Sequence, residues 1–524
     1  MKKRTDVIKV VKIMKALYLS YTRRERKESD TLRIMRDIII LIIPAIIEYS
    51  FQALVNYADF IMVGRLGMKA SATIGITNEV TFLVKAAVNA LSVGVVAYFA
   101  KEIGAGRRNK LQNPTLQAYL LAFIIGIFTT IIPLSISPVL PKLLGASKEL
   151  RSTASIYFAV SSSAGLFFSL NVIAGSIRKA TKDMKTPLII NGLVNILNII
   201  FNWFFIYPSL KFSLFQKELR IPRANMGVTG AALATALSIT IGGITMVIIN
   251  EKTKELSIKD YIFSRNIHNQ NHTDNPRKTI HNHSLKFFVV LRSSGFHFAL
   301  SLKNLRKIVD KDMMRTYIVV GLPAFFTSVI TSLGRVFFTA MIIPLGTSVY
   351  AAHSISFTAE SAFYIPAVGM ASAVAVLSGN VKGEGDQKKL NRQTNLVCAL
   401  VIVIMLMATS IMLLFADSII SIFTTDAYVR KTSPVLLRIV ALNEPFFGVS
   451  IVMQNVFNGI GKTKPPLIIS AFTQWCVRIL GVFIFVSILG FGIKTAWLCM
   501  ISDNIVRAIL LYSWYWISMK GNPH

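Results

Sequence analysis

The sequence predicts an all-α polytopic membrane protein with twelve transmembrane helices, arranged as two parallel six-helix repeats. First, the 524-residue chain is 53% hydrophobic with a mean hydropathy of +0.56, and only 16% of its residues are charged. Charged residues make up about a quarter of a typical soluble domain. Second, apolar stretches of the length needed to cross a hydrocarbon core of about 30 Å recur along the chain. Third, landmarks of the first half recur in the second half.

The apolar stretches are bounded by Gly, Pro and charged residues and fall into two groups of six. We expect twelve spans at residues 38–63, 72–99, 115–136, 152–174, 187–207, 227–249, 314–343, 350–377, 394–415, 434–457, 466–489 and 492–517. A polar stretch rich in Asn, His, Lys and Arg separates the sixth span from the seventh. Because this composition cannot bury a core of its own, we interpret it as a linker.

The distribution of positive charge predicts the orientation of the chain. A net charge of +32 would indicate nucleic acid binding in a soluble protein, but in a membrane protein the position of the charge decides its meaning. Most Lys and Arg residues lie in the N-terminal segment and in alternate loops, so both termini are expected in the cytoplasm, with no nucleic acid partner. The N-terminal segment lacks the apolar core and cleavage site of a signal peptide. The expected organisation is a basic cytoplasmic N-terminal segment (1–37), an N-lobe (38–250), a cytoplasmic linker (251–313), a C-lobe (314–517) and a cytoplasmic tail (518–524).

Cysteine and histidine patterns predict neither a disulfide framework nor a metal site. The three cysteines lie in apolar runs and show no CxxC spacing. Five of the seven histidines fall in the linker with irregular spacing, which favours a solvated segment over a metal-binding tract: His268, His272, His281, His283 and His297. The sequence also lacks a motif that would cluster His, Asp or Ser groups at one depth. We therefore expect a protein that is not an enzyme and has no bound cofactor.

The internal repeat predicts how the two halves are related. Landmarks recur at a constant separation of 279 residues, so that Pro44 corresponds to Pro323 and the PLII sequence at Pro187 recurs at Pro466. Because six is even, both halves enter the membrane in the same direction and are related by an axis along its normal. Parallel repeats of this kind are typical of transporters, whose substrate sites lie between the halves near the middle of the membrane.

Several motifs resemble those of the MATE (multidrug and toxic compound extrusion) exporters, members of the MOP flippase superfamily. DFIMVGRLG (59–67) resembles the aspartate-containing first helix of that family, and GVTGAALAT (227–235) resembles the start of its sixth helix. GSIRKATKDMKTP (175–187) resembles the loop between helices 4 and 5, and NGIGKTKPP (458–466) is its second copy. The run NGIGKT also resembles the end of a phosphate-binding loop, but Val456 occupies the required first glycine position, so we do not expect ATP as the energy source.

Polar residues within the spans form a candidate cation-coupling site. Asp59 lies about 8 Å before the first helix breaks at Gly64, where a charged side chain costs up to about 2.5–3.5 kcal/mol. Asn198 and Asn202 share a helix face, and Thr235 lies at a similar depth. Their oxygens suit a hard cation such as Na⁺, while the carboxylate alone could carry a proton. The structural alternatives are a hydrogen-bonding role for Asp59 and interhelical packing for the two asparagines.

The resemblance implies that Asp59, Asn198, Asn202 and Thr235 match a cation site in the first lobe of archaeal MATE members. Those members have a second aspartate at the position of Asn202. A single carboxylate compensates the dehydration of Na⁺ less well than two, whereas burial favours the neutral, protonated form of a carboxyl group. These arguments favour H⁺ over Na⁺ as the coupling ion, and both ions remain candidates.

Charged residues in the second half indicate a further candidate site. Glu360 and Glu444 are candidates for a second-lobe cavity, because acidic groups that face a central cavity favour cationic substrates. Arg335 is their expected counter-ion. A purely structural role for each of the three is the alternative.

These observations lead to two functional hypotheses on one fold. The first is a secondary active antiporter that exports organic, cationic and amphipathic solutes in exchange for H⁺ or Na⁺ by alternating access. The second is a flippase for a lipid-linked oligosaccharide or polysaccharide precursor, which a strongly basic central groove would favour. We expect a monomer in a prokaryotic cell membrane, with the lipid bilayer and small organic substrates as its partners.

Overall fold

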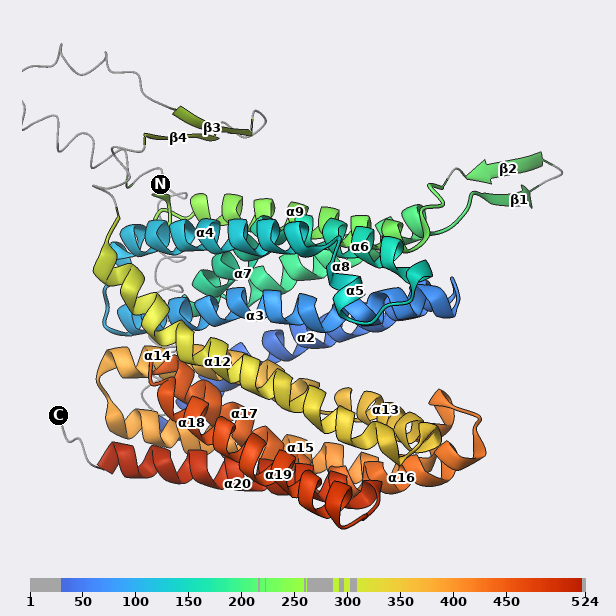
Figure 1. The fold of residues 1–524 in the computed structure, drawn as a ribbon. Helices are drawn as coiled ribbons and strands as arrows, with labels where there is room; N and C mark the ends of the chain where they lie inside the picture. Colours follow the sequence, from blue (N-terminus) through green and yellow to red (C-terminus); the bar gives the residue numbers. More distant parts are fainter. Residues whose placement is uncertain are drawn as a thin grey trace, which may run out of the picture.

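The computed structural model describes residues 30–214, 217–221, 223–258, 261, 286–291, 296–301 and 309–520. Two helical bundles lie side by side, one formed by the first half of the chain and the other by the second half (Figure 1). We keep the names N-lobe and C-lobe for these bundles. Residues 1–29, four of the five linker histidines and the last four residues of the chain lie outside the described residues.

The N-lobe contains eight helices among the described residues. They are α2 (Asp30–Gly64), α3 (Met68–Gly104), α4 (Gln112–Ile136), α5 (Leu140–Leu143), α6 (Lys148–Ser163), α7 (Gly165–Ala180), α8 (Lys185–Ile206) and α9 (Gly227–Glu251). One antiparallel hairpin follows α8 and another follows α9. Both lie outside the helical bundles, and the sequence, which predicts an all-helical chain, does not indicate them. Their strands are β1 (Leu210–Leu214), β2 (Lys217–Ile221), β3 (Lys286–Leu291) and β4 (Phe296–Ser301).

The C-lobe repeats the arrangement with more broken helices. They are α12 (Lys311–Ile342), α13 (Thr347–Ser361), α14 (Ile365–Glu384), α15 (Gln387–Phe423), α16 (Ala427–Ala441), α17 (Glu444–Gly459), α18 (Lys464–Phe472), α19 (Leu480–Val482) and α20 (Ile493–Lys520). Two π-helical segments, Thr473–Ile479 and Phe483–Ile488, continue the path of α18 and α19. Short 3-10 turns cover Arg108–Lys110 and Ile343–Leu345.

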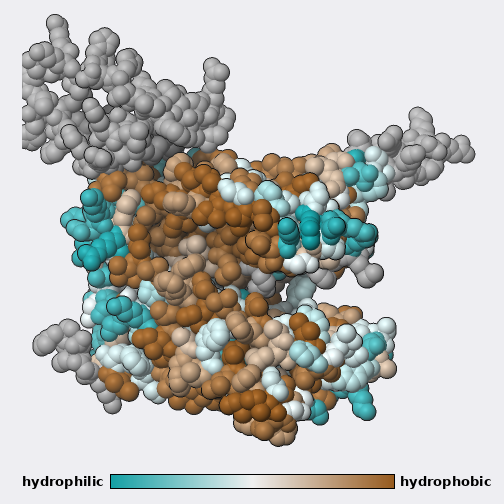
Figure 2. All heavy atoms as spheres, viewed as in Figure 1, coloured by the Kyte–Doolittle hydropathy of each residue, from teal (hydrophilic) through white to brown (hydrophobic). Residues whose placement is uncertain are grey.

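The surface and the helix lengths are those of an integral membrane protein. Within the described residues, ten helices are long and apolar enough to cross a membrane, and two bent helix pairs bring the number of spans to twelve. Hydrophobic side chains cover the middle of the visible face, while hydrophilic ones gather at its two ends (Figure 2). Large apolar side chains such as Leu414 and Ile422 are exposed by 74% and 81%, which is stable in lipid rather than in water. The predicted fold class is therefore confirmed.

Three of the expected spans are broken where the sequence predicts continuous helices. The fourth span consists of α6 and α7, which meet at a bend of 42°, and the tenth consists of α16 and α17, with a bend of 52°. The backbone N–H of Leu166 at the first bend donates to the hydroxyl of Thr130 on α4 (3.0 Å), which satisfies a group that the break leaves free. Pro445 at the start of α17 interrupts the tenth span. Pro366 at the start of α14 interrupts the eighth, which consists of α13 and α14.

The two lobes touch mainly at the end of the body that carries the α3–α4 and α14–α15 turns. We call this predicted cytoplasmic end the inner end, and the opposite end the outer end. There α3 packs on α12 and α14, and α2 packs on α14. Glycine allows the close approach, since a Cβ atom at Gly104 would overlap the backbone oxygen of Asn380, and one at Gly369 would lie 2.6 Å from the Cα atom of Ile46. Figure 2 shows a hollow between the lobes at the outer end.

Candidate functional site

The four residues of the predicted coupling site lie together in the N-lobe. Asp59 on α2 accepts a hydrogen bond from Nδ2 of Asn202 on α8, at 2.6 Å from its Oδ1 atom. Asn202 Nδ2 also lies 3.1 Å from Oδ1 of Asn198, whose side chain in turn lies 3.2 Å from the hydroxyl of Thr235 on α9. Three helices that are remote in sequence therefore place a carboxylate, two amides and a hydroxyl in one chain of contacts.

The amide orientations determine what this site offers to an ion. When the amide of Asn198 is turned so that its nitrogen faces Asp59, that nitrogen lies 2.8 and 3.1 Å from the two carboxylate oxygens and its oxygen accepts from Thr235. The carboxylate is then held by N–H donors from both asparagines. The buried Oδ1 atom of Asn202 has no hydrogen-bond partner within the described part of the chain. Asn202 thus directs a donor, not a ligand oxygen, at the carboxylate.

Lys85 is a charged neighbour of this site that sequence reasoning did not pair with it. Its ammonium group lies 5.7 Å from the centre of the Phe168 ring on α7 and interacts electrostatically with Asp59. Lys85 belongs to α3 and Asp59 to α2, and the pairing depends on how these helices pack. The hydropathy pattern marks Lys85 only as an unusual residue within a span.

The two second-lobe acids are buried close to each other. Glu360 on α13 is 8% exposed and Glu444 on α17 is 1% exposed, and the two interact electrostatically. Oε2 of Glu360 and both carboxylate oxygens of Glu444 have no hydrogen-bond partner among the residues that the structure describes. Buried polar atoms without partners are uncommon in folded proteins, and they cluster at functional sites.

The structure gives Arg335 different neighbours from the expected ones. Its guanidinium group lies 4.9 Å from the centre of the Phe82 ring and donates to the hydroxyl of Ser332 at 3.3 Å. The cation that interacts with Glu360 is Arg478, which also forms an ion pair of 2.7 Å with Asp503. Among the described residues Arg335 forms no ion pair with Glu360 or Glu444, and its expected role as their counter-ion stays a prediction.

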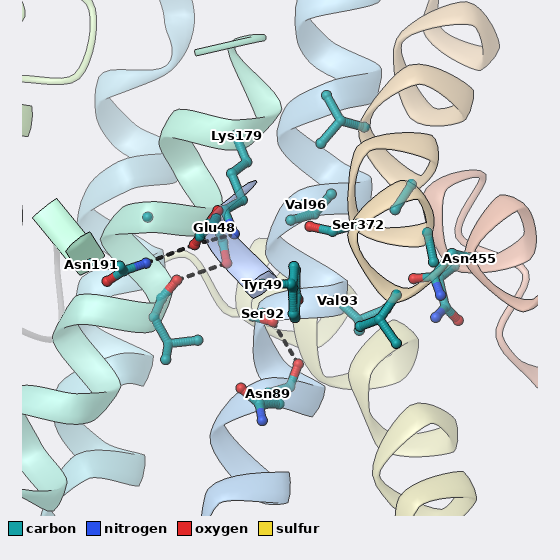
Figure 3. Close-up of a pocket in the computed structure, with 18 of the residues that line it drawn as sticks. Glu48, Tyr49, Asn89, Ser92, Val93, Val96, Lys179, Asn191, Ser372 and Asn455 are labelled. Carbon is teal, nitrogen blue, oxygen red and sulfur yellow. Dashed lines mark hydrogen bonds and ion pairs between the residues drawn. The ribbon is translucent and has the colours of Figure 1, made fainter. Parts of the chain in front are cut away.

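A third group of polar residues surrounds a cavity of about 420 Å³ between the lobes. Glu48 on α2, Lys179 on α7 and Asn191 on α8 line its N-lobe side, and Ser372 on α14 and Asn455 on α17 line the other (Figure 3). The sequence places Lys179 in a loop that resembles a family motif, but α7 continues to Ala180, and this helical turn directs the lysine at Glu48. The pair is separated by 131 residues along the chain, so no local pattern could reveal it.

Comparisons with known proteins agree with this architecture. A model of the MatE family matches residues 44–204 and 323–504, which is more than half of the chain. A probable multidrug resistance protein NorM of Thermotoga maritima is 26% identical over 498 residues, covering 94% of each chain. The uncharacterized transporter YisQ of Bacillus subtilis is 21% identical and covers 90% of this chain and 91% of its own.

Two solved structures share the fold. One is described as the outward-facing conformation of a multidrug resistance MATE family transporter of the MOP superfamily, with a TM-score of 0.77, 22% identity and coverage of 94% of this chain and 99% of that chain. The other is a MOP superfamily transporter from Pyrococcus furiosus, with a TM-score of 0.76, 21% identity and the same coverage. The predicted resemblance is confirmed: the chain is an integral membrane protein that belongs to the MATE family of transporters, and that family does not consist of enzymes.

Proposed function

We propose that this protein is a secondary active antiporter that exports organic cations in exchange for protons, with Asp59 as the group that carries the proton. The observation that carries this proposal is the position of Asp59, which joins α2 to α8 through Asn202 in the N-lobe. Protonation of the carboxyl group removes its charge and weakens the charge-assisted hydrogen bonds that hold the two helices together. A change of this kind gives the proton different affinities for two arrangements of the lobe, which coupling requires.

The groups around Asp59 favour a proton over a sodium ion. The site has a single carboxylate, and the asparagines surround it with N–H donors, whereas Na⁺ needs several oxygen ligands around it. The ammonium group of Lys85 also lies near Asp59, and its charge opposes H⁺ and Na⁺ alike.

Export of organic solutes is supported by the relatives and by the distribution of charge. Relatives of similar length are described as multidrug resistance proteins. Glu360 and Glu444 provide buried carboxylate oxygens without hydrogen-bond partners in the described part of the C-lobe, and acidic groups of this kind favour cationic ligands. The flippase alternative would be favoured by a strongly basic groove, but the cavity between the lobes has one acidic and one basic residue in its described lining. We place the protein in the plasma membrane, with the inner end facing the cytoplasm.

Transport in proteoliposomes tests this proposal. The purified protein is reconstituted with a fluorescent organic cation such as ethidium, and a pH gradient and a sodium gradient are imposed in separate experiments. We expect export to follow the pH gradient at equal sodium on both sides. Export that follows the sodium gradient and ignores pH would contradict proton coupling, while the location of the site at Asp59 would be tested separately by substitution.

A further inference from the structure

The cavity between the lobes contains a buried carboxylate with hydrogen bonds to only one of its two oxygens. Glu48 Oε1 accepts hydrogen bonds from Nδ2 of Asn191 at 2.7 Å and from the ammonium group of Lys179 at 3.0 Å. Asn191 accepts in turn from Nδ2 of Asn171 at 3.1 Å. All of these donors lead to one oxygen of the carboxylate. The other oxygen, Oε2, is buried without a hydrogen-bond partner in the described chain, on a side chain that is 9% exposed.

The cavity wall holds one more acceptor of this kind. Oδ1 of Asn171 is a second buried oxygen for which the described residues offer no donor. The hydroxyl groups of Ser92 and Ser176 and the amide nitrogen of Asn455 donate to backbone carbonyl groups of their own helices. The two hydroxyl hydrogens and one of the two amide hydrogens of Asn455 are therefore occupied, while lone pairs on the oxygens remain free. Buried acceptors without donors cost free energy, so Glu48 and Asn171 present two acceptors to a ligand that brings donors.

The charge of the cavity narrows the class of ligand further. Glu48 and Lys179 are the charged side chains of its described lining, so their charges cancel. An anionic headgroup would meet the free carboxylate oxygen of Glu48, and an apolar cation without hydrogen atoms to donate would leave that oxygen unsatisfied. A primary ammonium group has three donors and no acceptor, and its bond to a carboxylate is of the strong, charge-assisted kind.

We propose that this cavity is a binding site for a polar solute with a protonated primary amine, which donates to Glu48 Oε2 while Lys179 remains bound to Oε1. Hydroxyl groups on the same solute bind the serine and asparagine oxygens of the wall. Recognition then depends on Glu48 and on the amide chain that orients it. This inference rests on the proposed export function only where it identifies the bound amine as the solute that the protein exports.

Equilibrium binding to the purified full-length protein in detergent tests the inference without any ion gradient. The main probe is radiolabelled glucosamine in mildly acidic buffer. Two other probes are compared with it: N-acetylglucosamine has the same ring but no charge on its nitrogen, and tetraphenylphosphonium is a cation without a hydrogen-bond donor. We expect saturable binding of glucosamine, about tenfold or more tighter than that of N-acetylglucosamine, because a charge-assisted hydrogen bond is lost. The inference would be overturned if the two sugars bound equally tightly or if glucosamine showed no saturable binding. It would also be overturned if tetraphenylphosphonium displaced glucosamine and bound more tightly than either sugar.

Variants then locate the site. Glu48→Gln combined with Lys179→Met removes both charges, leaves no unpaired ion in the membrane and should weaken glucosamine binding about tenfold or more. Asn171→Leu removes the second free acceptor and the hydrogen bond to Asn191 that helps to orient Glu48, keeps both charges of the ion pair, and should weaken binding severalfold. The matched control is Glu149→Gln, which removes the carboxylate of the exposed Lys69–Glu149 ion pair at the outer end of the N-lobe. If the double variant folds and binds glucosamine as tightly as the control, the site is not at Glu48. Because the assay needs no gradient, failure of proton coupling would leave these results unchanged.

Discussion

Replacement of Asp59 by asparagine should abolish coupled export and leave the protein folded. Asparagine has nearly the same shape as aspartate, and its Oδ1 atom can still accept from Asn202, which lies 2.6 Å away in the native site. The variant exchanges a charge-assisted hydrogen bond for a neutral one, a difference of about 1 kcal/mol. The substitution also leaves the ammonium group of Lys85 without its acidic neighbour, which adds to the loss. We therefore expect a moderate decrease in the thermal unfolding midpoint.

The loss of transport should be much larger than the loss of stability. A gradient of one pH unit corresponds to about 1.4 kcal/mol per proton, which can maintain about a tenfold solute gradient for each proton exchanged. An amide does not exchange a proton in this range, so the solute gradient that Asp59→Asn maintains in proteoliposomes should fall to that of empty liposomes. Asp417→Asn, at an exposed ion pair with Arg438 in the C-lobe, is the matched control. Accumulation at the wild-type level by Asp59→Asn would refute Asp59 as the coupling group.

Three further substitutions test the ion and the contact between lobes. Asn202→Asp adds a second carboxylate beside Asp59 and should make export respond to an imposed sodium gradient; no gain of sodium response would contradict the single-carboxylate argument. Lys85→Met removes the fixed cation near the site and should also raise the sodium response, whereas Lys69→Met, on an exposed lysine of the same helix, should not. Gly104→Ala should strain the α3–α14 contact by about 1–3 kcal/mol and separate the inner ends of the lobes in distance measurements between spin labels. Gly75→Ala, in the same helix with open space around it, should leave those distances unchanged.

Much of the fold could be predicted from the sequence because its signals are long and local. Each span exceeds twenty residues, and the repeat aligns landmarks such as Pro44 and Pro323 without reference to packing. The breaks were missed because an apolar run has the same composition in a straight helix and in a bent one. The bend before Leu166 depends on the hydroxyl of Thr130 in another helix, which no pattern within the span reports.

The candidate coupling site could be predicted because its members lie at one depth on neighbouring spans. Their partners could not, because a charged residue within a span indicates its depth but not its direction. Arg335 and Arg478 illustrate this limit: the guanidinium group of Arg335 lies over the Phe82 ring of the N-lobe, and Arg478 is a cation that interacts with Glu360, a pairing that the spacing along the helices does not indicate. Tertiary packing decides such pairings, and the sequence pattern contains only the spacing along each helix.

The coupling site at Asp59 and the cavity site at Glu48 are connected through the same pair of helices. Glu48 and Asp59 are both on α2, eleven residues or about 16 Å apart along the axis, and each is hydrogen-bonded to an asparagine of α8, Asn191 and Asn202 respectively. A proton at one site and an amine at the other would therefore both act on the packing of α2 against α8. Because coupling between sites is reciprocal, Asp59→Asn should change the affinity for glucosamine by about fivefold or more, in the range typical of coupled sites. The control Asp417→Asn should not change it, and equal affinities in the two variants would mean that the α2–α8 contact does not connect the sites.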